Sequence, residues 1–210
     1  MTNLRRRGFI LFAAALAAGS VAAQPAASPQ AVERLLHETS GAAVLPYSTR
    51  DFGRDKYAAG RSVRVLEAGA DALLAKVRAK LPPGWVAWIG VTHDLADKPA
   101  AAGVVELAAA PGRDQFDILR AAATDGANYD LQTEDIVKEL QAWDREFGVD
   151  IRRAESDTVQ LRLKKLPKNV KAFAQRVYKF CPDIVEQGVG SVEELEKAIV
   201  KDKVVYLWWD

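Results

Sequence analysis

The sequence predicts an α+β fold: a mixed or antiparallel sheet packed with helices, forming a single compact globular unit after an N-terminal arm. Segments whose apolar residues repeat at helical spacing, such as 70–81, alternate with short β-branched and aromatic segments such as 85–91. Apolar residues stand at every second position in 149–151 and in 159–163, with a polar turn between them, which predicts a hairpin with one solvent-facing side. Helices that alternate with strands and with a hairpin indicate the α+β class.

The first half of the chain divides into two parts. Residues 24–60 begin with a spacer rich in Pro, Ala and Ser and contain one short helix candidate, so we interpret them as a tether and a surface arm. Residues 61–112 predict a β-α-β-β part. Its elements are a pair of alternating valines, a helical apolar stripe that stops at Pro-Pro-Gly, an apolar aromatic run and a valine-rich strand, at residues 63–65, 70–81, 85–91 and 104–108.

The second half, residues 113–210, is mostly regular. An apolar stripe predicts a helix that begins with Thr133 as its N-cap and ends at Gly148. Ser191, with a glutamate three residues later, forms a capping box that opens another helix. The last strand, 204–209, is apolar at both alternations, so we expect it to be covered on both faces. Helical spacing predicts two further helices, at 115–123 and 170–181.

The composition excludes several classes of protein. Of the 210 residues, 49% are hydrophobic and 27% are charged, which is typical of a globular chain with a sizeable core. The 29 basic and 28 acidic residues give a formal charge of +1, so we expect no nucleic-acid partner. One cysteine excludes an intramolecular disulfide and a cysteine-rich zinc site, and two histidines leave few ways to build a histidine-based metal site. We expect no metal and no cofactor.

The N-terminus has the three parts of a cleaved export signal over residues 1–23. Three arginines at 5–7 precede an apolar run at 9–18, which is too short to span a bilayer, and small residues at 21–23 supply a cleavage site. The string Arg-Arg-Gly-Phe-Ile-Leu at 6–11 resembles a twin-arginine signal, and a general secretory signal is the alternative. We therefore expect a periplasmic or secreted protein with no stable membrane insertion after cleavage.

Several stretches of the second half form a recognisable pattern in order and spacing. They are Thr-Asp-Gly-Ala-Asn-Tyr at 124–129, the Trp143-centred helix that runs into Phe147 and Gly148, Phe-Cys-Pro-Asp-Ile-Val at 180–185, Gln-Gly-Val-Gly at 187–190 and Leu-Trp-Trp-Asp at 207–210. Together they resemble a bacterial family catalogued as domain of unknown function 4253, from near residue 113 to the end. The resemblance implies membership of an uncharacterised family and supplies no catalytic residues.

Two candidate sites have a structural explanation that we prefer. Cys181 could act as a nucleophile, but it ends a predicted helix and continues an apolar stripe, so we interpret it as a buried structural cysteine. His93, Asp94 and Asp97 could ligate a metal, but no second histidine lies at ligand spacing, so we predict no metal site there. Trp143 lies on the apolar stripe of its helix and is expected in the core.

Two polar segments, 124–132 and 183–190, are the stronger candidates for a ligand or partner rim. The second contains two glycines, which permit close backbone approach, directly before a capped helix. If the helices beside the two segments pack antiparallel on one sheet, the segments meet. Turn and cap chemistry is the explanation that we prefer for these segments, and a functional surface, if the protein has one, is expected here rather than around His93. The predicted rim consists of Asp125, Asn128, Tyr129, Asp183, Gln187, Gly188 and Gly190.

The sequence leaves two functions open. The first is a non-catalytic binding or interaction module, of which an inhibitor or immunity protein is one form, with another protein or a small molecule as its partner. The second is a cofactor-independent hydrolase that uses carboxylates from the segments Asp125–Asp130 and Asp183–Glu186. In a hydrolase these carboxylates should converge with a raised pKa, whereas in a binding module they should be dispersed or used in caps.

Overall fold

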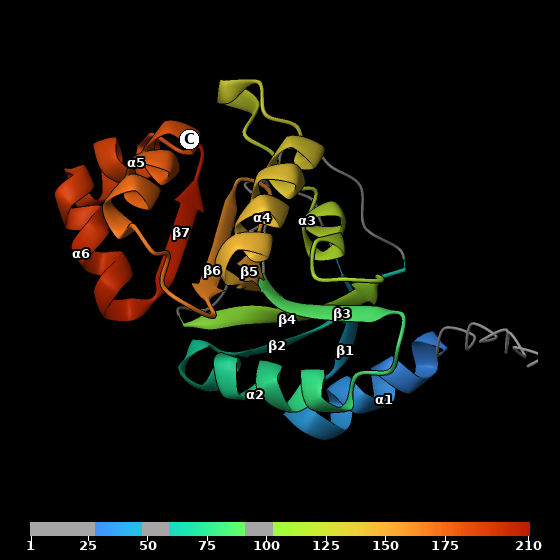
Figure 1. Ribbon diagram of the computed structural model, residues 1–210. Coiled ribbons are helices and arrows are strands. Elements are labelled where there is room, and N and C mark those ends of the chain that lie inside the picture. Colours follow the sequence, from blue (N-terminus) through green and yellow to red (C-terminus); the bar gives the residue numbers. More distant parts are fainter. Residues whose placement is uncertain (1–27, 48–58, 91–102) are drawn as a thin grey trace, which may run out of the picture.

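The computed structural model describes residues 28–47, 59–90 and 103–210 (Figure 1). The predicted export signal and the His93 segment lie outside the described residues. Along the described chain the elements are α1 (Pro29–Ser40), β1 (Val44–Pro46), β2 (Arg61–Leu66), α2 (Glu67–Lys80), β3 (Trp85–Gly90), β4 (Val104–Pro111), α3 (Asp117–Ala122), the 3₁₀ turn η2 (Ala127–Tyr129), α4 (Thr133–Phe147), β5 (Val149–Ala154), β6 (Thr158–Leu163), α5 (Val170–Phe180), the π-helical turn η3 (Ile184–Val189), α6 (Val192–Asp202) and β7 (Val204–Trp208).

The strands form one seven-stranded sheet in the order β1-β2-β4-β3-β5-β6-β7. Neighbouring strands are antiparallel except β3 and β5, which run parallel and meet at the pair Ile89 and Arg153. The sheet is therefore mixed, and the α+β class predicted from the sequence is confirmed. Because β3 and β5 pair over so short a length, β5, β6 and β7 run in a different direction from β3 and β4 (Figure 1).

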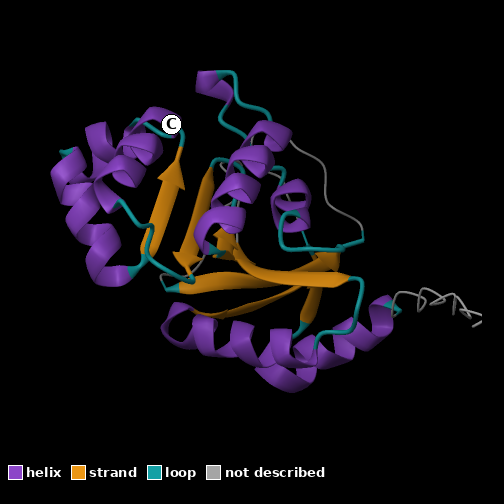
Figure 2. Cartoon of the chain, in the orientation of Figure 1, coloured by secondary structure: helices purple, strands orange, loops and turns teal. Residues whose placement is uncertain are grey.

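Helices α1 and α2 cover one face of the half-sheet β1-β2-β4-β3 (Figures 1 and 2). Strand pleating sends alternate residues to this face, where Val63, Ile89 and Leu107 are buried in one cluster with Leu36 and Leu74 of the helices. The described part of the predicted arm thus contributes a helix to the core, and its strand β1 pairs with β2 at the sheet edge.

The opposite face shares a larger core with α3, α4, α5 and the second half-sheet. Trp143 of α4 is fully buried, as expected from its stripe, and lies edge-on to Phe173 of α5 with ring centroids 4.9 Å apart. The ring centroids of Phe147 and Phe173 are 4.8 Å apart, and those of Trp209 and Phe180, which also lie edge-on, are 5.5 Å apart. These aromatic pairs fix α4 and α5 against each other, and they determine where the two predicted polar segments lie.

Three local predictions need correction. Gln132, not Thr133, is the N-cap of α4, because its side chain and that of Asp135 form the capping box. Segment 183–190 is not polar throughout: its residues Ile184–Val189 form the π-helical turn η3, in which Ile184 and Val185 are buried. Strand β7 is not covered on both faces: it is the last strand of the sheet and Tyr206 is 45% exposed.

Candidate functional site

The two predicted polar segments do meet, and Asp183 is the point of contact. Tyr129 Oη donates a hydrogen bond to Asp183 Oδ1 at 2.6 Å, and Gln187 Nε2 donates to the same oxygen at 3.1 Å. The backbone N–H of Asp210 donates to Asp183 Oδ2 at 2.9 Å. Asp183 is 3% exposed, so its carboxylate forms a buried link between η2, η3 and Asp210.

These contacts indicate that Asp183 stabilises the fold and does not act in catalysis. Burial alone would raise the pKa of Asp183, but the hydrogen bonds from Tyr129, Asp210 and Gln187 outweigh it and hold that pKa below its usual value. The same bond to Asp183 raises the pKa of Tyr129 to about 12. An ionised carboxylate with three donors is a stable acceptor and a poor proton donor, which is the pattern expected of a structural contact rather than of a general acid.

Within the described residues, the other predicted rim residues donate no hydrogen bond to the Asp183 carboxylate. Asp125 binds the turn between β5 and β6 through its backbone N–H, 2.8 Å from the carbonyl oxygen of Ser156. Asn128 is exposed. Gly190 ends η3 with a left-handed φ of 84°, a conformation that favours glycine. Gly188 is exposed within the same turn.

Cys181 is fully buried, as predicted. Its Sγ donates to the carbonyl oxygen of Trp208 at 2.9 Å and accepts from the N–H of Trp208 at 3.1 Å. Burial raises the pKa of the Cys181 thiol to about 11, despite the hydrogen bonds it accepts from the backbone. The thiol is thus a polar link between the end of α5 and β7.

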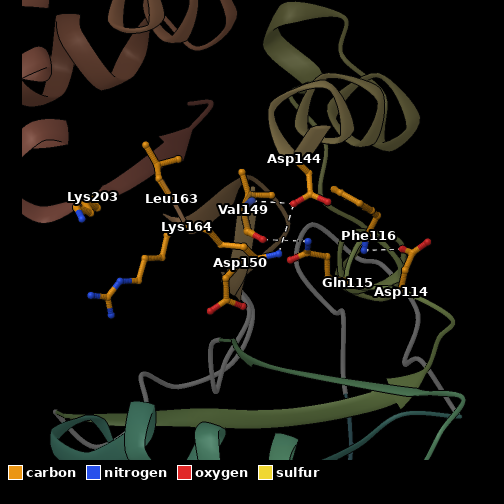
Figure 3. A pocket seen from close by; sticks show the side chains of 10 residues that line it. Asp114, Gln115, Phe116, Asp144, Val149, Asp150, Leu163, Lys164 and Lys203 are labelled. Atoms are coloured by element: carbon orange, nitrogen blue, oxygen red, sulfur yellow. Dashed lines mark hydrogen bonds and ion pairs between the residues drawn. The ribbon is translucent and has the colours of Figure 1, made fainter. Parts of the chain in front are cut away.

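A polar pocket of about 690 Å³ lies where α3, α4, β5, β6 and the start of β7 meet; we call it the junction pocket (Figure 3). Its volume is within the range of small-molecule sites. All of its lining residues belong to the second half of the chain, and the sequence analysis named none of them as a candidate. They are Asp114, Gln115, Phe116, Asp144, Val149, Asp150, Arg162, Leu163, Lys164 and Lys203.

The charges of the junction pocket fall into two groups. Arg162 and Lys203 have no ion-pair partner within residues 28–47, 59–90 and 103–210. Asp114 Oδ1 accepts from the N–H of Phe116 at 2.8 Å. Asp144 Oδ1 accepts from the N–H of Val149 at 2.8 Å and also lies 3.6 Å from Lys164 Nζ, so the other oxygen of Asp144 is the one left for a ligand. In Figure 3, Lys203 lies on one side of the pocket, and Asp114 and Asp144 lie on the other.

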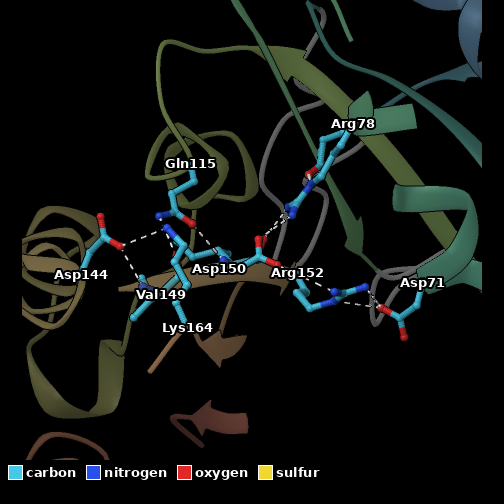
Figure 4. A network of polar contacts seen from close by, with 10 residues as sticks. Asp71, Arg78, Gln115, Asp144, Val149, Asp150, Arg152 and Lys164 are labelled. Atoms are coloured by element: carbon cyan, nitrogen blue, oxygen red, sulfur yellow. Dashed lines mark hydrogen bonds and ion pairs between the residues drawn. The ribbon is translucent and has the colours of Figure 1, made fainter. Parts of the chain in front are cut away.

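A network of side chains holds the wall of this pocket where the two half-sheets diverge (Figure 4). The side-chain amide of Gln115 binds the backbone of β5 as a neighbouring strand would. Its Nε2 donates to the carbonyl oxygen of Val149 at 3.1 Å, and its Oε1 accepts from the N–H of Ile151 at 3.0 Å. On the other side, Arg78 donates to the carbonyl oxygen of Ala87 at 2.8 Å and to that of Ile151. These bonds satisfy backbone groups of Val149 and Ile151 on β5, and of Ala87 on β3, where the two strands diverge.

The charged groups of the network are also committed. Arg78 binds Asp150 Oδ1 at 2.6 Å, and Arg152 binds Asp71 at 2.6 Å and lies 3.7 Å from Asp150 Oδ2. Asp150 therefore faces the junction pocket with both oxygens already near a cation. Burial lowers the pKa of Arg78 although Asp150 opposes that effect.

Glu106 is the buried titratable residue that sequence reasoning missed. It lies on β4, is 7% exposed, and accepts a hydrogen bond from Ser62 Oγ. Burial raises its pKa to about 7, although the bond from Ser62 opposes the shift. Trp88, whose Nε1 has no partner within the described residues, faces the same side of the half-sheet. The signal in the sequence was one acid within an otherwise apolar strand.

The described residues hold no cluster of three or more His, Cys, Asp or Glu side chains suited to a metal. His93, Asp94 and Asp97, the metal candidates of the sequence, lie outside these residues. Among the described helices, none is both long and apolar enough to cross a bilayer.

Comparison with known proteins gives a family and no functional precedent. No curated protein and no solved structure matches the chain. A family model matches residues 106–210, which is half of the chain and includes the whole junction pocket together with Glu106. The resemblance noted in the sequence is thereby confirmed. The chain belongs to the family described as domain of unknown function (DUF4253).

Proposed function

We propose that this chain is an exported, non-catalytic binding module that holds a small zwitterionic ligand in the junction pocket. The observation that carries the proposal is the polarity of that pocket. The cations Arg162 and Lys203 have no ion-pair partner in the described residues. Asp114 and Asp144 line the same pocket, and within the described residues each has one carboxylate oxygen that accepts no hydrogen bond. Separated charges of opposite sign favour a ligand that carries both an anionic and a cationic group.

The ligand class follows from the size and charge of the pocket. A volume of about 690 Å³ accommodates a molecule of amino-acid to short-peptide size. We assign a carboxylate or phosphate group to Arg162 and Lys203, because guanidinium and ammonium groups bind such anions. We assign an ammonium group to Asp114 and Asp144. Gln115 holds the β5 wall between these groups through Val149 and Ile151, and Lys164 Nζ, 3.6 Å from Asp144 Oδ1, leaves the other oxygen of Asp144 for the ligand.

A binding role is better supported than hydrolysis. The hydrolase alternative requires carboxylates from two segments to converge with a raised pKa. Asp183 has a lowered pKa and three donors, and Glu186 accepts from Tyr178 Oη at 2.9 Å. Asp125 and Asp130 lie in the other segment, and Asp130 is exposed. These carboxylates are therefore either used structurally or dispersed, as expected of a binding module.

The proposal is tested by calorimetric titration of the mature chain with the dipeptide Ala-Ala and with two blocked forms. The unblocked dipeptide should bind, whereas N-acetylation and C-terminal amidation should each weaken binding at least about tenfold, because each removes one charged contact. Equal affinity for all three peptides would overturn the zwitterion assignment. Binding of the N-acetylated form alone would indicate a simple anion site and would also contradict the proposal.

The matched variants use substitutions of the same charge. Arg162→Gln with Lys203→Gln should abolish measurable binding of the dipeptide. Arg145→Gln with Lys179→Gln removes the same two charges from exposed positions that do not line the pocket, and it should leave affinity unchanged. Equal loss in both double variants would show that net charge, and not the junction pocket, determines binding.

A further inference from the structure

The outer edge of β7 presents unpaired backbone groups. In an antiparallel pair, only alternate residues direct their N–H and C=O toward the neighbouring strand. The bonds from Leu163 N to Lys203 O, at 2.8 Å, and from Trp209 N to Asp157 O, at 3.1 Å, fix this alternation between β6 and β7. The backbone N–H and C=O groups of odd-numbered residues in β7 therefore point toward β6, and those of even-numbered residues point away from the sheet.

One of the three outward residues is already satisfied and two are not. Trp208 directs its N–H and C=O to the thiol of Cys181. The outward N–H and C=O groups of Val204 and Tyr206 form no hydrogen bond within the described part of the chain. Two adjacent pairs of donors and acceptors, at strand spacing, match the backbone of an extended segment.

An apolar groove runs along this unpaired edge. It has a volume of about 320 Å³ and lies between β7, η3 and α6. Val189 and Tyr206 are 38% and 45% exposed, so the groove is open to solvent beside the unpaired groups. Asp202 is its one charged lining residue and has no ion-pair partner within the described ranges. The lining residues are Ile184, Gly188, Val189, Leu195, Ala198, Asp202, Val204, Tyr206 and Trp208.

We propose that this groove binds an extended segment of a partner protein, which adds to the sheet as a strand beside β7. The segment pairs with Val204 and Tyr206 through its backbone, places an apolar side chain in the groove, and carries a basic residue at the end beside Asp202. Cys181 limits the pairing at Trp208, so the added strand is short. A second copy of this chain fits less well, because its own β7 is flanked by η3 and α6.

The test is amide hydrogen exchange read by NMR, with the blocked peptide Lys-Val-Thr-Val-Thr as the probe. Without peptide, the amides of Val204 and Tyr206 should exchange at least about tenfold faster than those of Val205 and Leu207, which bind β6. Added peptide should slow Val204 and Tyr206 and leave the other two unchanged. N-methylation of both valines, or in a second peptide of both threonines, blocks one of the two possible alternations, so at least one of the two methylated peptides should give no protection.

Two variants separate backbone pairing from charge. Tyr206→Pro removes one outward donor at an edge position that tolerates proline, and it should abolish protection of Val204 by the peptide. Asp202→Asn should weaken peptide binding about threefold or more while the protection pattern persists. Equal protection by both methylated peptides would overturn the proposal. So would protection of Val204 and Tyr206 that rises with protein concentration in the absence of peptide, because the occupant would then be a second copy.

Discussion

Cys181 occupies a position where a small polar side chain satisfies one residue of an edge strand. Its Sγ exchanges two hydrogen bonds with the backbone of Trp208 while remaining fully buried. Burial from the apolar stripe could be predicted from the sequence. The partner could not, because Trp208 is 27 residues away and the contact depends on how η3 returns the chain to β7.

Cys181→Ala should lower the free energy of unfolding by about 1–2 kcal/mol, because it removes buried volume and leaves two groups of Trp208 without a partner. Chemical denaturation measures this loss. In the native wild-type protein, a thiol reagent should react slowly until denaturant is added, since the pKa of about 11 leaves little thiolate. Rapid stoichiometric labelling of the native protein would contradict the structural assignment.

Glu106 should make stability depend on pH in a direction unusual for a carboxyl group. Its pKa rises from an ordinary 4.5 to about 7 in the folded protein. Well below pH 4.5, Glu106 is protonated in both the folded and the unfolded protein, and its contribution to the free energy of unfolding is at its maximum. As the pH rises toward 7, the unfolded state releases its proton first, so stability falls by up to about 3 kcal/mol and is then constant.

Glu106→Gln removes this titration while keeping an acceptor for Ser62. The variant should be more stable than wild type at pH 8, by an amount on the order of 2 kcal/mol, and similar to it at pH 4.5. Urea denaturation at both pH values gives the comparison. If the wild type and the variant have the same slope of stability between pH 5 and 7, Glu106 does not titrate in that range.

At the level of elements, α4 and α5 bring η2 and η3 together, and Asp183 fixes the contact. The sequence predicted this convergence on the condition that the two helices pack antiparallel on one sheet. The use of the carboxylate was not predictable. It depends on Tyr129 and on the backbone of the final residue, Asp210, whose direction after β7 leaves no trace in local sequence.

Asp183→Ala should lower the free energy of unfolding by about 2–3 kcal/mol, because Tyr129 and the Asp210 backbone lose a charged acceptor in a buried place. Asn128→Ala, at an exposed position of the neighbouring segment, should change it by less than about 0.5 kcal/mol. Both effects are read from urea denaturation. Binding of the dipeptide to the junction pocket should be unchanged in both variants. Two folded variants that both lose the ligand would instead assign the site to the predicted rim.

The whole molecule is two half-sheets that meet at one parallel pair, and this arrangement creates the junction pocket. Local periodicity predicted the strands and helices well, including the hairpin and the helix over 133–147. It could not predict strand order, because the crossing from β4 through α3 and α4 to β5 depends on long-range pairing. Local periodicity does not distinguish Arg78 and Gln115 from ordinary surface residues, although both bind the backbone of β5 where it leaves β3.

Export, if it occurs, changes the chemistry of the whole chain. Cleavage after residue 23 removes three arginines and no acids, so 26 basic residues remain against 28 acidic ones and the formal charge becomes −2. It also removes the one methionine, at position 1. The mature protein then has a single sulfur atom, that of Cys181, which is buried and is therefore shielded from oxidation.

The route of export is tested by replacing Arg6 and Arg7 with lysine. A twin-arginine signal requires the arginine pair itself, so the double lysine variant should accumulate inside the cell as uncleaved precursor. A general secretory signal needs only positive charge before its apolar run, and it should export the same variant normally. Cell fractionation and mass spectrometry of the N-terminus distinguish the two results. Mature protein beginning near Gln24 is expected from the wild type, and its normal yield from the lysine variant would assign the general route.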